Sequence, residues 1–185
     1  MKKWYIITIL LFCVFLNFYS VRAAEINMRT GITYNTYQLN QLNEFAQERG
    51  GSPVNSGKGI NFGVETEIYR NVYAGVTTEY MSVYYNDLET NEDIKASNLG
   101  LMLNGAYSLN DYLRFNAAVV QYIVNVNYFD NDDTAYSPGA KLGLEGNMDI
   151  NNRIDIGLGS SYRFAEVGDY DFSGMEINLL VNIKF

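Results

Sequence analysis

Apolar and polar residues alternate with a period of two along most of the chain from Ile26 to its last residue. This period places successive side chains on opposite faces of an extended chain, so it predicts β-strands. In the last run, Ile177 and Leu179 share one face while Asn178 lies on the other. Polar or Gly/Asn-rich segments separate the runs, and the pattern predicts eight strands. The runs cover residues 26–35, 60–68, 73–80, 98–107, 113–119, 140–150, 154–163 and 175–185.

The composition of the two faces favours a membrane barrel over a soluble protein. A soluble barrel or sandwich would bury the apolar face and expose the polar one, and alternation alone fits that alternative. Here, however, the polar face mixes charged residues with many glycines and asparagines, which suits a narrow and crowded interior. Aromatic residues such as Tyr34, Tyr80 and Tyr162 cluster near the ends of the runs. Transmembrane barrels carry aromatic girdles at these positions, so we expect the apolar face to contact lipid.

Connections between the runs alternate in length. Short connections lie near residues 70–72, 108–112 and 151–153. Transmembrane barrels have long extracellular loops and short periplasmic turns, so an even strand number places both ends of the chain on the periplasmic side. Long connections span residues 38–58, 86–95, 130–137 and 165–173.

Two places complicate the alternation. In the fifth run the parity is lost at Gln121, which we interpret as a bulge or as the rim of the barrel. At the turns 70–72 and 151–153, a two-residue hairpin would pair Tyr69 with Val72 and exchange the two faces. We therefore predict three-residue turns at both positions.

The first 23 residues are typical of a secretory signal peptide. Positive charge at residues 2–3 precedes an apolar stretch over residues 4–19 and a small-residue cleavage site at 21–23. The alternative, an uncleaved transmembrane helix, is less favoured because the apolar stretch is shorter than the roughly 20 residues that span a bilayer. We predict that residues 1–23 are removed and that one barrel domain occupies residues 24–185.

Cysteine content and charge narrow the chemistry of the mature chain. Its only cysteine, Cys13, lies in the leader and follows the bulky Phe12, where a lipoprotein signal has a small residue. The mature chain therefore has neither disulfides nor thiol chemistry in an oxidising compartment. Three of the 13 basic residues lie in the leader, which leaves 10 against 21 acidic residues, a net charge of −11. This charge opposes nucleic-acid binding, which depends on basic patches.

The last strand resembles the C-terminal signal strand of bacterial outer-membrane proteins. The resemblance lies in the alternating Leu179, Val181 and Ile183 and in the terminal aromatic Phe185. It implies recognition by the barrel-assembly machinery through these four residues. The mature chain is similar to the small eight-stranded outer-membrane barrels of the OmpA-transmembrane, OmpX and OmpW-like type. This similarity implies an all-β, antiparallel, up-and-down transmembrane barrel in the bacterial outer membrane, a monomer in contact with outer-membrane lipids and lipopolysaccharide.

Charged residues on the polar face are the main candidate site. One interpretation is a charged pore or a proton-coupled site, and the other is an ion-pair network that fills the barrel. We favour the network, because an eight-stranded barrel has just enough interior for its own side chains. Pairing Tyr37 with Gly59 would place Arg29 opposite Glu67, and Arg163 falls opposite Glu176 across the last hairpin. The expected network comprises Arg29, Glu65, Glu67, Glu79, Arg114, Lys141, Glu145, Asp155, Arg163 and Glu176.

The first long loop carries a helical pattern. Leu39, Leu42 and Phe45 recur at three- and four-residue spacing, which predicts a short amphipathic helix before the Gly-rich segment 50–53. Such a helix would cap the barrel mouth, lie along the membrane interface or present a ligand surface. In the favoured alternative, the loop packs its own apolar residues.

Two acidic segments, 87–93 and 130–133, have oxygen ligands suited to divalent cations, but neither has the spacing of a calcium loop. We interpret them as solvated loop charge, bridged loosely by cations to lipopolysaccharide phosphates.

The chain contains no histidine. Membrane-barrel enzymes such as the lipid A palmitoyltransferase, the lipid A deacylase and the omptin protease use a histidine in catalysis. Without histidine or a mature cysteine, the usual pairs of base and nucleophile are missing, so we expect no enzyme, cofactor or metal centre. The expected function is envelope structure or surface interaction through the loops. The alternative is a narrow OmpW-like channel or transporter for small or apolar molecules, for which the apolar face of the first loop is the only hint.

Overall fold

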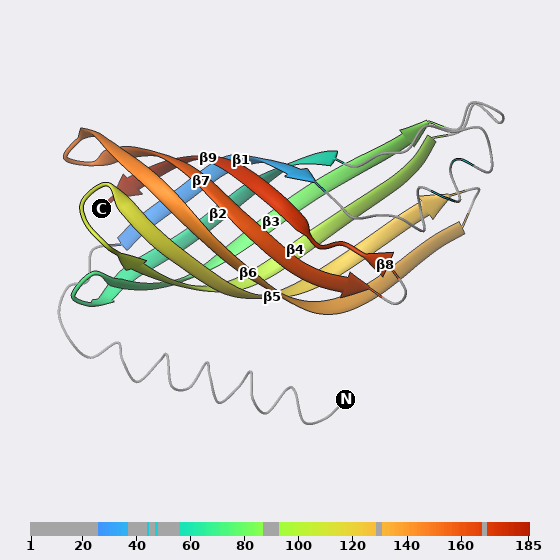
Figure 1. The fold of residues 1–185 in the computed structure, drawn as a ribbon, viewed down its shortest axis with the longest axis horizontal. Helices are drawn as coiled ribbons and strands as arrows, with labels where there is room; N and C mark the ends of the chain where they lie inside the picture. Colours follow the sequence, from blue (N-terminus) through green and yellow to red (C-terminus); the bar gives the residue numbers. More distant parts are fainter. Residues whose placement is uncertain are drawn as a thin grey trace, which may run out of the picture.

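The chain forms a closed, eight-stranded, antiparallel β-barrel (Figure 1). The computed structural model describes residues 26–36, 44, 47, 56–86, 93–128, 131–167 and 170–185. Within these ranges, no helix is long and apolar enough to cross a bilayer. The strands are β1 Ile26–Thr36, β2 Ser56–Tyr69, β3 Val72–Asn86, β4 Asp93–Ser108, β5 Leu113–Tyr128, β6 Asn131–Asn151, β7 Ile154–Val167, β8 Tyr170–Asp171 and β9 Gly174–Lys184.

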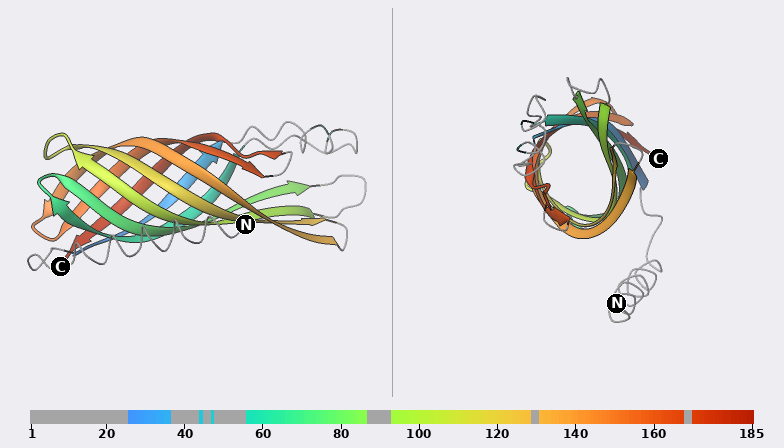
Figure 2. Two further views of the ribbon diagram at one scale, coloured as in Figure 1. Left: turned by 90° about the horizontal axis from the view of Figure 1, so that it is seen from below. Right: turned by 90° about the vertical axis from the view of Figure 1, so that its right-hand side faces the viewer.

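Each long strand pairs with its neighbours in the sequence, and the pairing of β1 with β9 closes the ring. Seen along the barrel axis, the strands are arranged in a closed ring (Figure 2). The short β8 pairs with the end of β7 in the same register as β9, so β8 and β9 together form the eighth strand of the ring. The fold prediction is therefore confirmed. The predicted leader and the apolar face Leu39, Leu42 and Phe45 lie outside the described residues, so both stay predictions.

The two faces of the barrel are those that the alternation predicts. Apolar residues such as Ile32 and Leu158 point outward and are 61% and 62% exposed, while Arg163 and Glu176 point inward and are 0% and 1% exposed. Every main-chain group within the ring can pair with a neighbouring strand, which is the condition for a sheet in lipid. The resulting molecule has an apolar exterior and a charged interior.

Two of the predicted turns are shorter than expected. Tyr69 pairs with Val72, and Asn151 pairs with Ile154, so both turns contain only two residues. The faces are not exchanged, because a register shift between Glu67 and Tyr69 inserts one extra residue into β2 just before the turn, and a second shift does the same in β6. A β-bulge has the same effect on parity as a third turn residue. The prediction of three-residue turns was wrong, although the parity argument behind it holds.

The expected irregularity at Gln121 is also absent. The pairing of β5 with β4 and β6 runs through Gln121 without a shift. Gln121 is exposed on the outer face, and the inward positions that follow it are Tyr122 and Val124. β5 therefore continues without a bulge. From Gln121 onward, a polar residue lies on its outer face and apolar residues lie on its inner face.

The two ends of the barrel differ, as Figure 1 shows. At the turn end lie the short connections 70–71, 109–112 and 152–153, together with the C-terminus. At the opposite end, called the loop end, strands extend into segments that were expected to be loops, since β4 starts at Asp93 and β6 at Asn131. Outward aromatic residues occur at both ends, where a membrane barrel has its interfaces. They include Tyr34, Tyr136 and Phe164 at the loop end, and Tyr69, Tyr107, Tyr112 and Phe185 at the turn end.

Candidate functional site in the barrel lumen

Charged side chains in the half of the lumen nearer the turn end form the lower cluster, which consists of Arg29, Glu65, Arg114 and Glu145. The Arg29 Nη1 and Glu65 Oε2 atoms are 3.1 Å apart, and the Arg114 Nη1 and Glu65 Oε1 atoms are 2.6 Å apart. Arg29 Nη2 also bonds Glu145. Two positive and two negative charges balance, so the cluster is neutral.

Barrel closure brings the lower cluster together. Arg114 and Glu145 are direct partners on β5 and β6. Glu65 reaches Arg114 across the lumen from β2, a strand that does not neighbour β5. The cross-strand partner of Glu65 on β3 is Gly75, and a Cβ on Gly75 would lie 2.7 Å from the Glu65 Cβ. A glycine at this position therefore leaves the room that the carboxylate and its guanidinium partners need.

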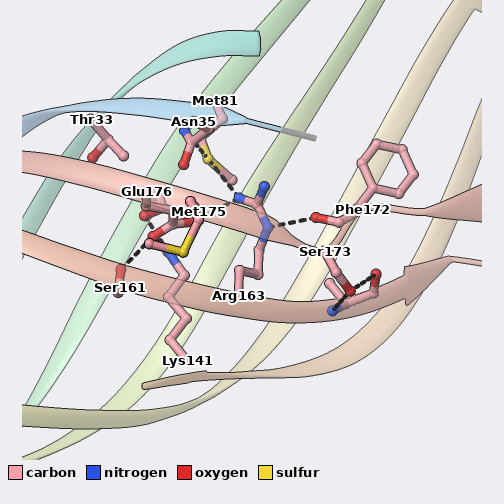
Figure 3. Close-up of polar contacts among 12 residues, drawn as sticks. Thr33, Asn35, Met81, Lys141, Ser161, Arg163, Phe172, Ser173, Met175 and Glu176 are labelled. Carbon is pink, nitrogen blue, oxygen red and sulfur yellow. Dashed lines mark hydrogen bonds and ion pairs between the residues drawn. The ribbon is translucent and has the colours of Figure 1, made fainter. Parts of the chain in front are cut away.

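A second group of charges, the upper cluster, lies nearer the loop end and consists of Glu79, Lys141, Arg163 and Glu176. Figure 3 shows the last three of these residues. Lys141 Nζ lies 2.6 Å from Glu79 Oε2 and 2.8 Å from Glu176 Oε2. Arg163 Nη1 lies 2.8 Å from Glu176 Oε1. This cluster is also neutral, and the exposed fraction of each of its side chains is 9% or less.

An apolar layer covers the upper cluster at the loop end. It contains Met81, Tyr122, Val124, Ala165 and Phe172, each at most 4% exposed. Arg163 of the upper cluster bonds this layer directly. Its Nε donates to the main-chain oxygen of Phe172, and its Nη1 donates to the sulfur of Met81. The pattern of polar and apolar residues did not indicate this layer, although the unbroken parity of β5 places Tyr122 and Val124 inward.

Between the two clusters lies a chamber of about 110 Å³. Both clusters contribute to its walls, and neutral polar groups line the space between them. This volume is room for several water molecules, and a polar lining is what buried water requires. The neutral polar side chains that line it are Asn61, Thr77, Asn104, Asn116, Ser161 and Asn178.

Eight of the ten charged residues expected inside the barrel belong to these two clusters. Asp155 lies at the rim of the turn end, where its Oδ2 is 2.9 Å from the Nζ of Lys184. Glu67 is exposed, and its carboxylate accepts a hydrogen bond from the main-chain N–H of Asn71. Within the described residues, Glu67 takes part in neither cluster.

The expected cross-strand partners were wrong, although the expected faces were right. Arg29 lies opposite Gly63 rather than Glu67, and Arg163 lies opposite Gly174 rather than Glu176. The register differs by four residues in the first case and by two in the second. An even shift leaves every side chain on the same face, so the alternation cannot detect it. Arg163 still reaches Glu176 diagonally.

The proposed assembly-signal residues lie on the outer face of β9. Leu179 and Val181 are 48% and 37% exposed, Ile183 is half-buried, and Phe185 is 72% exposed. The main-chain N–H of Phe185 donates to the oxygen of Ile26, beside the seam between β9 and β1. Recognition of these residues by an assembly machinery stays a prediction.

Solved structures of outer-membrane proteins resemble this barrel, while no protein-family model and no curated protein matches the chain. Ail of Yersinia pestis, in complex with the heparin analogue sucrose octasulfate, is 9% identical with a TM-score of 0.58, covering 89% of this chain and 100% of Ail. OprG from Pseudomonas aeruginosa is 12% identical with a TM-score of 0.54, covering 89% of this chain and 97% of OprG. Neisserial surface protein A is 13% identical with a TM-score of 0.53, covering 89% of this chain and 98% of that protein. The chain therefore has the fold of the small eight-stranded outer-membrane barrels, as the sequence analysis predicted.

Proposed function

We propose that the chain is a non-enzymatic barrel of the bacterial outer membrane, closed to ions, which acts in envelope structure or surface binding through its loop end. The loop end would face outward and the turn end the periplasm. The surroundings proposed for it are outer-membrane lipids and lipopolysaccharide, with the barrel-assembly machinery as a partner during biogenesis. The apolar outer face and the location of the proteins that share its fold support this proposal.

The filled lumen carries the functional part of the proposal. An ion that crossed the barrel would have to separate the ion pairs of the lower and upper clusters and pass the apolar layer. Separating a buried pair leaves charges without compensation in a medium of low dielectric constant, which is costly. The interior therefore supports a structural role for the charges rather than a transport role, and leaves the loop end as the surface for interaction.

The chamber of about 110 Å³ favours a second candidate, a narrow conduit. Single-channel recording on the refolded mature protein in a planar bilayer separates the two candidates. We expect no reproducible open steps, because the clusters on both sides of the chamber block ions. Reproducible steps would overturn the closed lumen and support the conduit.

The orientation of the two faces can be tested by chemical labelling, because the mature chain has no cysteine of its own. A lipid-soluble maleimide in proteoliposomes should modify cysteines placed at Leu144 and Leu179, which are 51% and 48% exposed on the outer face. Matched cysteines at the inward positions Asn104 and Asn178 should stay unmodified, since these side chains line the chamber. Preferential modification of the two inward positions would show that the barrel is oriented inside out.

A further inference from the structure

Two buried carboxylate oxygens beside the chamber have no hydrogen-bond partner among the described residues. Each carboxylate uses one oxygen for its ion pair, Glu79 Oε2 with Lys141 and Glu145 Oε2 with Arg29. The other oxygens, Glu79 Oε1 and Glu145 Oε1, are the two without a partner. Both residues are 2% exposed, and both line the chamber. A buried oxygen that lacks a donor lowers stability, so these positions call for a donor that the described side chains do not supply.

The two carboxylates belong to different clusters, and glycines keep these clusters apart. Lys141, which pairs with Glu79 in the upper cluster, and Glu145 of the lower cluster share the inner face of β6. Gly143 lies between them on that face and lines the chamber, as does Gly159 on β7. Because a glycine has no side chain, these two positions leave the space that separates the two clusters.

The charges on the chamber wall favour a small, neutral donor of hydrogen bonds. The carboxylates of Glu79, Glu145 and Glu176 line the space, and so do the cationic groups of Arg29 and Lys141. The two cationic groups repel a metal ion, and the carboxylates repel an anion. The volume of about 110 Å³ holds several water molecules, and each water molecule has the donors that the two free oxygens require.

The two ends of the chamber differ in their contact with solvent. Toward the loop end, the Arg163 side chain is 0% exposed and bonds Met81 of the apolar layer (Figure 3). Toward the turn end, the Arg29 side chain is 14% exposed, and its Nε donates to Asn182. Asn182 in turn donates to Asn147. Polar groups thus continue from the lower cluster toward the turn end, whereas apolar side chains close the loop end.

We propose that the chamber is a buried water site that fills from the turn end. Its water molecules donate hydrogen bonds to Glu79 Oε1 and Glu145 Oε1 and so complete both clusters. The apolar layer stops the water on the side of the loop end, so the lumen is a hydrated chamber with one entrance and not a pore. The inference goes beyond the proposed function, because it holds whichever side of the membrane the turn end faces.

Solid-state NMR in lipid vesicles, with ¹³C in the methionine methyl groups, tests whether the chamber holds water. Met102 lines the chamber and Met81 lies in the apolar layer, and they are 7% and 1% exposed. Proton polarisation should pass from water to the Met102 methyl group at least about threefold faster than to that of Met81. In G159A the new Cβ makes only ordinary contacts, the nearest at 3.6 Å, so the variant should fold, displace water and slow the transfer to Met102. Equally slow transfer to both methionines would show a dry chamber and overturn the proposal.

Oxidation by hydrogen peroxide in detergent micelles tests the entrance. Peroxide is neutral and little larger than water, and it converts the methionine thioether to a sulfoxide with release of water. We expect Met102 to be oxidised about tenfold or more faster than Met81, which the apolar layer shields. V124A thins this layer, so it should raise the rate at Met81 and leave the rate at Met102 within about twofold.

An equal rise at both methionines in V124A would place the entrance at the loop end and overturn the proposal. The boiled and unboiled mobility of the variant on a gel checks folding, and if V124A does not fold, the two rates in the unchanged protein decide. Equally fast oxidation of Met102 and Met81 in that protein would show a lumen open from end to end, and would overturn the closed lumen of the proposed function as well. A dry chamber would overturn the water site alone.

Discussion

Replacing Glu65 by leucine is expected to lower the free energy of unfolding by about 3–5 kcal/mol, the range for breaking a buried ion pair. The Glu65 side chain is 4% exposed and bonds the guanidinium groups of both Arg29 and Arg114. In this variant Arg29 keeps Glu145 as a partner. For Arg114, however, the Glu65 carboxylate is the only anionic partner among the described residues, and its other hydrogen bond is to Asn116. The variant therefore leaves a buried positive charge uncompensated. Urea unfolding in lipid vesicles measures the loss.

A double-mutant cycle separates charge imbalance from lost packing. The variant E65L/R114L removes one charge of each sign and leaves the neutral pair Arg29 and Glu145, so it should be more stable than E65L alone. The matched control is E67Q on the same strand, where the exposed side chain should change stability by no more than about 0.5 kcal/mol. A large effect at Glu67 with a small one at Glu65 would contradict the observed register.

Replacing Gly174 by alanine is expected to cost about 3 kcal/mol, at the upper end of the usual range for overpacking. A Cβ at this position overlaps the main-chain oxygen of Thr36 on β1. The backbone of β1 cannot rotate away as a side chain would, because Thr36 Oγ1 also bonds the main chain of Met175. The added methyl group must therefore separate β1 from β9 at the seam that closes the barrel. Thermal unfolding followed by the loss of heat-dependent gel mobility measures the effect.

Gly105 offers a matched control on the outer face. A Cβ there has no heavy atom within 4 Å, so G105A should change stability by no more than about 0.5 kcal/mol. Equal losses in G174A and G105A would mean that the glycine backbone, and not the contact with Thr36, decides the effect. A neutral G174A would show that β1 and β9 can separate at this point without cost.

The alternation of side chains predicted the strands and their faces well, because it is a local property of each segment. Charged residues such as Arg29 and Glu176 were placed inward from parity alone, and both are in the lumen. Parity also required an extra residue near each short turn, at 70–72 and 151–153. The sequence did not reveal that this residue lies in the strand as a bulge, since both solutions keep the faces continuous.

The apolar layer shows where the chemistry of a face misleads. At Gln121 the polar residue moves to the outer face and the apolar ones, Tyr122 and Val124, to the inner face. We interpreted this change as a break in geometry, whereas the strand continues without a shift. Near the loop end the lumen is filled by apolar side chains, so polarity no longer indicates which residues face inward. The side chains of β5 still alternate between the two faces there.

By itself, the sequence determined how many strands form and which charged side chains lie on the inner face, because a period of two acts within each strand. Only the tertiary structure decided which of those side chains meet. Ring closure brings Glu65 of β2 to Arg114 of β5 across the lumen, and the register selects the partners of Arg29 and Arg163. A shift of two or four residues leaves the alternation unchanged, so the choice among these registers depends on contacts between strands that no single segment contains.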